Sequence, residues 1–192
     1  MSEGRRGRGS GELWLVRHGE TEWSRDGKHT STTDLPLTHE GEEVARSLAP
    51  RLTGSFDLVL TSPRLRARRT AELTGHPEAE PDENLAEWAY GDYEGRTTEE
   101  IREQVPGWTV WTHPCPGGET AEQVSARLDR VVERCQDVER ALVFAHGHAL
   151  RVLTARWLDL PATDGRHFRL DTATLSVLGW ERESPVILRW NA

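Results

Sequence analysis

The chain alternates short apolar runs with amphipathic stretches. Apolar runs occupy residues 13–16, 56–60 and 141–145, and polar residues and then helical periodicity follow each run. Uninterrupted apolar runs of this length are typical of strands that are buried on both faces of a parallel sheet. The alternation therefore predicts an α/β fold, a three-layer α/β/α sandwich with a mostly parallel sheet.

Periodicity and capping residues predict three helices between the strands. Apolar side chains, Val44 among them, recur every four residues after Thr38, which predicts a helix over roughly 39–52 that Thr38 caps. Two further starts carry the capping-box pattern of a threonine followed three residues later by Gln or Glu. These pairs are Thr120 with Gln123, before a long apolar stripe, and Thr97 with Glu100, before a short helix near 98–104.

The end of the chain changes to strand-like alternation. Residues 174–180 and 186–190 alternate apolar and polar side chains around a Ser184-Pro185 turn, which predicts a hairpin that places an antiparallel strand at the edge of the sheet. Residues 88–119 are rich in Gly, Pro and Trp and show weak periodicity. This segment is predicted to be a lid-like insertion over the active site rather than a second domain.

Composition narrows the class of protein. A length of 192 residues fits one domain, predicted over 13–192, after a disordered tail over 1–12. The formal net charge of -8 opposes binding to nucleic acid or to an anionic membrane, so neither is a predicted partner. The two cysteines and the lack of an export signal predict a cytoplasmic protein without a disulfide framework. A homo-oligomer is compatible with these features.

Polar groups follow three of the predicted strands. Arg17 and His18 follow the first, Arg66 lies shortly after the second, and His146 follows the third. The carboxyl ends of parallel strands meet at one edge of a sheet, where these two arginines and two histidines could surround a phosphate. Ser62 and Pro63 are predicted to be the N-cap and first residue of a helix that carries Arg66.

A metal site is the alternative reading of the histidines. His146 and His148 could form a ligand pair if the strand continued through them. No motif places a third ligand, so no metal and no other cofactor is predicted.

Four sequence blocks together resemble the histidine phosphatase superfamily, also called phosphoglycerate mutase-like. The resemblance runs from residue 13 to about 190. The blocks, in chain order, are LVRHGETEW at 15–23, LPLT at 35–38 with Gly41, SP at 62–63 with RA at 66–67 and TA at 70–71, and AHG at 145–147. The segment at 108–119 is also similar to that of short bacterial acid phosphatases in the mutase-like branch.

The resemblance implies the roles of the catalytic residues. His18 would be the nucleophile that becomes a phosphohistidine, and Arg17, Arg66 and His146 would stabilise the charge on the transferred phosphoryl group. Glu87, in an E-x-x-Y-G pattern that ends at Gly91, would be the general acid that protonates the leaving group.

The same resemblance implies further contacts with the substrate. Tyr90 would contact the substrate, and Ser24, Thr30 and Ser31 fall where the family binds phosphate, although Ser31 stands at a position where glycine is more usual. The amide of Gly147 is a further expected phosphate donor.

The predicted function is a metal-independent phosphomonoester hydrolase that acts through phosphohistidine on a small phosphorylated metabolite, such as a sugar phosphate or a phosphoglycerate-like compound. A cofactor-dependent phosphoglycerate mutase, an isomerase, is one alternative, but residues 96–118 offer only Arg96 and Arg102 to hold a bisphosphorylated cofactor. A protein phosphohistidine phosphatase is a second alternative, although its members are smaller and lack the E-x-x-Y-G segment. An inactive phospholigand-binding module is the third, and it would lack the nucleophile or the acid.

Overall fold

A computed structural model describes residues 10–192, and these residues form a six-stranded sheet with the order β3-β2-β4-β1-β5-β6. Strands β1, β2, β3 and β4 are parallel, and β5 runs antiparallel to β1. The strands are β1 (Glu12–Arg17), β2 (Leu58–Thr61), β3 (Glu80–Pro81), β4 (Arg140–Ala145), β5 (Leu175–Glu181) and β6 (Ser184–Arg189). The predicted α/β class with a mostly parallel sheet is confirmed, and the one reversed strand, β5, lies next to the edge strand β6.

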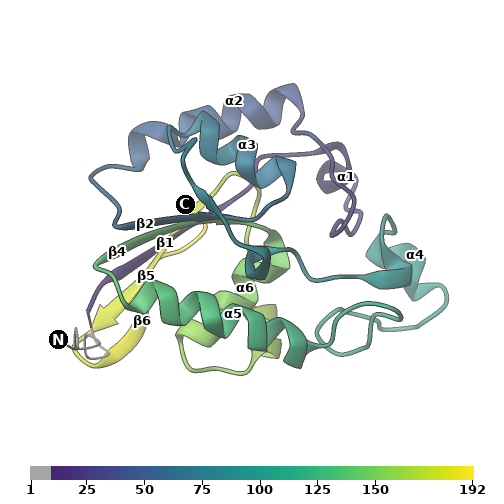
Figure 1. The fold of residues 1–192 in the computed structure, drawn as a ribbon. Helices are drawn as coiled ribbons and strands as arrows, with labels where there is room; N and C mark the ends of the chain where they lie inside the picture. The colour runs from purple at the N-terminus through teal and green to yellow at the C-terminus, as the bar shows by residue number, and fades with distance from the viewer. Residues whose placement is uncertain (1–9) are drawn as a thin grey trace.

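Helices cover both faces of the sheet, as Figure 1 shows, with α2 and α3 on one side and α5 and α6 on the other. Each face has its own hydrophobic cluster, so the sheet forms the middle of three layers. The helices are α1 (Glu22–Arg25), α2 (His39–Ser47), α3 (Leu65–Leu73), α4 (Thr98–Arg102), α5 (Ala121–Gln136) and α6 (Gly147–Trp157), with 3-10 turns at Ala49–Arg51, Glu83–Leu85, Gly91–Tyr93 and Ala162–His167. Within residues 10–192, no helix is long and apolar enough to cross a membrane.

The predicted helix starts are correct, whereas one helix end and one buried position are not. Thr38, Thr97 and Thr120 each accept a hydrogen bond from the backbone of the third helical residue. The helix predicted over 39–52 ends at Ser47, and a 3-10 turn follows, because Pro50 has no amide hydrogen and disfavours helical geometry at the residue before it. Val44 is 44% exposed, so it is not a core residue of this helix.

The terminal hairpin forms, but its turn is not Ser184-Pro185. Both of these residues lie in β6, and the chain reverses at Arg182 and Glu183, with Arg182 in the left-handed region at φ 56°. Ser-Pro is common in turns, but Pro185 is tolerated in a strand here because β6 is an edge strand.

The structure adds detail to two of the predicted segments. Of the tail predicted over 1–12, residues 1–9 lie outside the described residues, and Glu12 already belongs to β1. Residues 88–119 contribute buried aromatic side chains to the main hydrophobic cluster, including Trp88 at 2% and Trp108 at 1% exposure. This segment is therefore packed into the core on its inner side, and Tyr90 extends from it to the cavity described below.

Candidate active site

The sheet register brings the predicted catalytic groups to one edge. Arg17 at the end of β1 pairs with Ala145 at the end of β4, so His18 and His146 leave neighbouring strands at the same level. Their ring centroids lie 5.2 Å apart. Arg66, which enters from α3, donates from Nε to Nδ1 of His146 over 3.1 Å. The structure therefore brings together the two arginines and two histidines of the motifs.

His18 is held with one ring nitrogen bound and the other free to attack. Its Nδ1 lies 2.7 Å from the carbonyl oxygen of Gly19, and because a carbonyl only accepts, Nδ1 must carry the hydrogen. Nε2 then carries the lone pair, as a nucleophile requires. Burial, together with Arg66 and Arg17, holds the pKa of His18 well below its usual range. The ring is therefore neutral near pH 7.

His146 uses both ring nitrogens within the protein. Because a guanidinium only donates, Nδ1 accepts from Arg66, and Nε2 then donates to Oγ of Ser62 over 2.7 Å. Burial first, and then Arg66, hold the pKa of His146 well below its usual range. In this arrangement His146 orients Arg66, and a direct contact with phosphate would require it to exchange one of these bonds.

Ser62 therefore does not have its predicted role as a helix cap. Helix α3 begins at Leu65, three residues after Ser62, and its N-cap residue Arg64 makes no side-chain cap. Asp34 accepts a hydrogen bond from the Leu65 amide over 2.8 Å instead. Arg66 is consequently the second helical residue rather than one full turn into the helix.

Arg66 is fully buried, and main-chain carbonyls fix its guanidinium. Nη1 donates to Thr33 O and Nη2 to Thr30 O, each over 3.1 Å. Glu94 holds this loop, because its carboxylate accepts from the amides of Ser31 at 2.9 Å and Thr33 at 3.0 Å and from the Ser31 hydroxyl at 2.5 Å. Burial opposes ionisation of Glu94, but these donors prevail and lower its pKa. Both donors of Ser31 are thus used by Glu94.

A cavity of about 170 Å³ opens beside His18. It is lined by Arg17, His18, Thr21, Ser24, Gly27, Lys28, His29, Thr30, Glu87, Tyr90, Gly147, His148, Arg151 and Leu170. Seven of the ten predicted site residues line it, whereas Arg66, His146 and Ser31 lie behind its wall. The hydroxyl of Ser24 is bonded to the backbone of Thr21 and that of Thr30 to Lys28 O, so neither is free of a protein partner.

Arg17 presents unused hydrogen-bonding capacity beside the start of α6. Its Nη1 donates to Leu170 O over 2.5 Å, and its buried Nε has no partner among residues 10–192. A Cβ at Gly147 would lie 3.2 Å from the guanidinium carbon of Arg17, so glycine allows the close approach of the two. An unpaired guanidinium nitrogen next to a helix N-terminus is a favourable place for an anion.

Glu87 lies at the same helix end. One carboxylate oxygen accepts from the amides of Trp88 and Ala149, each over 2.8 Å, and the other accepts from the amide of His148 over 3.0 Å. The side chain therefore caps α6 while it lines the cavity. Among the described residues, the second oxygen accepts only the His148 amide, so it keeps a lone pair that can carry the proton for a leaving group.

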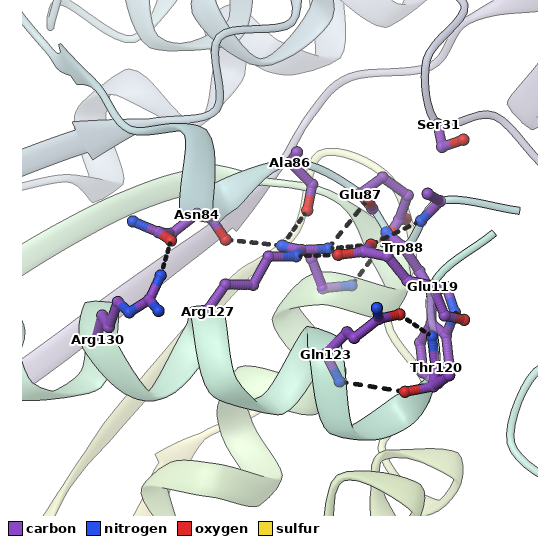
Figure 2. Close-up of polar contacts among 12 residues, drawn as sticks. Ser31, Asn84, Ala86, Glu87, Trp88, Glu119, Thr120, Gln123, Arg127 and Arg130 are labelled. Atoms are coloured by element: carbon purple, nitrogen blue, oxygen red, sulfur yellow. Dashed lines mark hydrogen bonds and ion pairs between the residues drawn. The ribbon is translucent and has the colours of Figure 1, made fainter.

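An arginine of α5 fixes the segment that carries Glu87, as Figure 2 shows. Arg127 donates from Nη1 to Asn84 O and Ala86 O over 2.7 Å and from Nη2 to Glu87 O over 3.2 Å. Its Nε also donates to Glu119 over 2.8 Å. Glu119 in turn accepts from the Ala89 amide over 2.9 Å. We call Arg127 and Glu119 the Arg127–Glu119 clamp, which ties the main chain on both sides of Glu87 to α5.

Tyr90 and His148 form the far wall of the cavity. Burial raises the pKa of Tyr90 well above its usual range, and its hydroxyl shares a hydrogen bond with Nδ1 of His148 over 2.6 Å. Burial likewise holds the pKa of His148 well below its usual range and lowers that of His29 to about 4. His29 and His148 therefore line the cavity as neutral rings near pH 7.

Sequence reasoning missed several residues that support this site. Glu94, Arg127 and Asp34 act across long sequence separations that no local pattern reveals, and Thr70, which belongs to a motif, was given no role although its Oγ1 accepts from the Gly19 amide over 3.0 Å. Arg151 could have been found, because it lies three residues after His148 and so shares one face of a predicted helix. Within residues 10–192, no cluster of three or more His, Cys, Asp or Glu side chains could hold a metal ion.

The fold and the site are typical of proteins that transfer phosphoryl groups through a histidine at the carboxyl edge of a parallel sheet. The chain belongs to the histidine phosphatase superfamily (branch 1), whose family model matches residues 13–192. This match confirms the resemblance and, with it, the predicted phosphatase class.

Similar proteins agree with this assignment. An acid phosphatase from Mycobacterium tuberculosis is 44% identical, with 88% of this chain and 86% of that protein covered. Sedoheptulose 1,7-bisphosphatase from Saccharomyces cerevisiae is 39% identical, with 76% and 67% covered. The solved structure of the open reading frame Rv3214 from Mycobacterium tuberculosis has a TM-score of 0.87 at 40% identity and covers 94% of this chain and 97% of its own.

Proposed function

We propose that this protein hydrolyses phosphomonoesters of small metabolites through a phosphohistidine at His18. The observation that carries the proposal is a pair of nitrogens without a hydrogen-bond partner among the described residues, Nε2 of His18 and Nε of Arg17. Both residues line a cavity together with the N-terminus of α6. A phosphate placed there meets a nucleophile, a guanidinium and amide donors at once. The names of the relatives, an acid phosphatase and a sugar bisphosphatase, support the same reaction and a phosphorylated metabolite as substrate.

The reaction follows from these groups in two steps. Nε2 of His18 attacks phosphorus, the P–O ester bond breaks, and Glu87 gives its proton to the leaving oxygen. Water then attacks the phosphohistidine and loses its proton to the Glu87 carboxylate, and the N–P bond breaks to release phosphate. Arg17 stabilises the charge on the phosphoryl oxygens in both steps, while His146 keeps Arg66 oriented behind the cavity wall.

Hydrolysis is favoured over mutase chemistry by the place of the basic residues in the 88–119 segment. Arg96 donates to Glu100 O and Gln104, and Arg102 donates to Trp108 O, so both bind their own segment. Neither lines the cavity. A bisphosphorylated cofactor would therefore find no additional cation from this segment, and water can compete for the phosphohistidine.

A metal-free phosphatase panel tests the proposal. The protein, treated with chelator, is assayed on an aryl phosphate and on a set of metabolite phosphates, with 2,3-bisphosphoglycerate-dependent mutase activity measured alongside. We expect hydrolysis, a trapped phosphohistidine on acid-free quenching, and the loss of both in His18→Ala. Dominant mutase turnover, or a phosphoenzyme that persists in His18→Ala, would overturn the proposal.

We further propose a cytoplasmic location. Cys115 and Cys135 are both buried and unpaired, which suits a reducing compartment.

A further inference from the structure

The cavity carries more positive charge than one phosphate group uses. Arg17, Lys28 and Arg151 line it, whereas Glu87 is its one carboxylate among the described residues. This surplus lies within a chain whose formal net charge is -8, so it is local to the site. A phosphate bound at His18 next to Arg17 leaves Arg151, which forms no ion pair within residues 10–192, without an anionic partner of its own.

Hydrogen bonds to the protein hold Arg151 in place at the cavity. It lies on α6 one turn after His148, and it donates from Nε to Gly165 O and from Nη2 to Arg166 O, each over 3.0 Å. Its guanidinium carbon lies 4.7 Å from the ring centroid of Trp111. Nη1 has no hydrogen-bond partner among residues 10–192, and the residue lines the cavity.

The surroundings of Arg151 keep this arrangement in place. A Cβ at Gly165 would come within 2.8 Å of the Trp111 ring, so glycine is needed where the ring packs under the guanidinium. Trp111 in turn lies edge-on to His148 at 5.2 Å between ring centroids. Arg151 is thus held in position before any ligand binds, which reduces the entropy lost on binding.

We propose that Arg151 binds a second anionic group of the substrate, a phosphate or a carboxylate carried on the same carbon chain as the phosphate that is cleaved. The proposal rests on the proposed function and names the substrate class of the same site. A substrate with a neutral tail would remove water from Arg151 without supplying a counter-ion, which is unfavourable for a guanidinium. An anionic tail instead gains a charge-assisted hydrogen bond from the free Nη1.

Two matched substrate pairs test this inference. Glycerol 3-phosphate and 3-phosphoglycerate differ by a carboxylate, and fructose 6-phosphate and fructose 1,6-bisphosphate differ by a second phosphate. We expect kcat/KM to be at least tenfold higher for the member with two anionic groups in one or both pairs. The preferred pair identifies whether carboxylate or phosphate is bound, and no preference in either pair would overturn the inference.

Variants then assign the preference to Arg151. Arg151→Met should reduce the kcat/KM ratio within the preferred pair at least tenfold, mainly through KM of the two-anion member, and Arg151→Lys should retain part of it. Arg156→Met is the matched control, because Arg156 lies on the same helix but pairs with Asp129 over 2.7 Å and does not line the cavity. The control should keep the ratio.

Equal losses on both members of the pair in Arg151→Met would assign Arg151 to the cleaved phosphate and overturn the inference. If Arg151→Met does not fold, Arg151→Lys and the salt dependence of KM in the unmodified protein decide, since KM of the two-anion member should rise more steeply with salt. An aryl phosphate separates the two proposals. If it is not hydrolysed, the proposed function fails, whereas hydrolysis without a pair preference refutes only the role of Arg151.

Discussion

Acid should destabilise this protein well above the pH at which its carboxylates titrate. Burial holds the pKa values of His18, His146 and His148 well below the usual range and lowers that of His29 to about 4. Below pH ~6.5 the unfolded chain takes up protons on these imidazoles and the folded chain does not. Because the unfolded state then binds more protons, the free energy of unfolding must fall as the pH falls.

The size of the effect follows from the number of buried rings. Each imidazole that stays neutral in the folded protein lowers the free energy of unfolding by about 1.4 kcal/mol per pH unit once the pH is below its ordinary pKa. Integrated from pH 6.5 to pH 5, four such rings remove roughly 6 kcal/mol, which is comparable with the whole stability of ~5–15 kcal/mol typical of a domain. For His29 the loss ends near pH 4, where its folded form also binds a proton.

Denaturant unfolding followed by tryptophan fluorescence at pH 7.5, 6.5, 5.5 and 5.0, at constant ionic strength, measures this loss. His29→Gln should remove about one quarter of the loss, or roughly 1.5 kcal/mol between pH 6.5 and 5. His39→Gln is the control, because the His39 side chain is 88% exposed. A loss below about 2 kcal/mol over this range, or equal slopes for the two variants, would refute the reasoning.

Three further predictions concern the residues around Glu87 and Arg66. Glu87→Gln should slow alkyl phosphates about 100-fold or more, and aryl phosphates far less, because only a poor leaving group needs the proton; equal losses measured by kcat on both ester types would contradict this role. Arg127→Met, which removes the Arg127–Glu119 clamp, should lower kcat for alkyl phosphates more than for aryl phosphates. Arg130 lies on the same helix, and among the described residues its side chain donates only to the Asn84 side chain, over 3.5 Å. Arg130→Met should therefore have little effect, and identical kcat values in the two variants would argue against the clamp. Glu94→Gln should lower the free energy of unfolding by about 2–4 kcal/mol, since an amide nitrogen would then face backbone N–H donors; an unchanged unfolding midpoint and kcat would show that the loop does not depend on this carboxylate.

The strands and the edge on which the site lies could be predicted because both depend on local patterns. A short apolar run followed by polar residues identifies a buried parallel strand and its carboxyl end. Because β1 and β4 are neighbouring parallel strands, their last residues, Arg17 and Ala145, pair at the same edge of the sheet. The end of α2 at Ser47 could also have been predicted, because Pro50 is visible in the sequence. Alternation in the terminal hairpin, by contrast, did not reveal which residues form its turn.

The partners of the predicted side chains could not be found in the same way. His146 and Ser62 are 84 residues apart, and Arg127 contacts the carbonyl of a residue 40 positions away. Such contacts depend on how the layers of the fold pack against one another. The side chains that form these hydrogen bonds do not recur at regular spacing in the sequence, so no periodic pattern identifies them. The motifs therefore identified which residues meet at the site, while the fold decides which of them line the cavity and which lie behind it.

The partners of the arginines also separate those that can act on a ligand from those that hold the fold. Neutral acceptors rather than carboxylates orient three arginines: main-chain carbonyls hold Arg17 and Arg151, and carbonyls together with His146 hold Arg66. A neutral acceptor fixes the direction of a guanidinium but leaves its full charge in place, so Arg17 and Arg151, which line the cavity, remain able to attract an anion. Arg127, by contrast, forms an ion pair with the Glu119 carboxylate over 2.8 Å, which neutralises its charge. An acidic protein can in this way keep a positive cavity, provided that its cations are held by neutral acceptors wherever a substrate must bind.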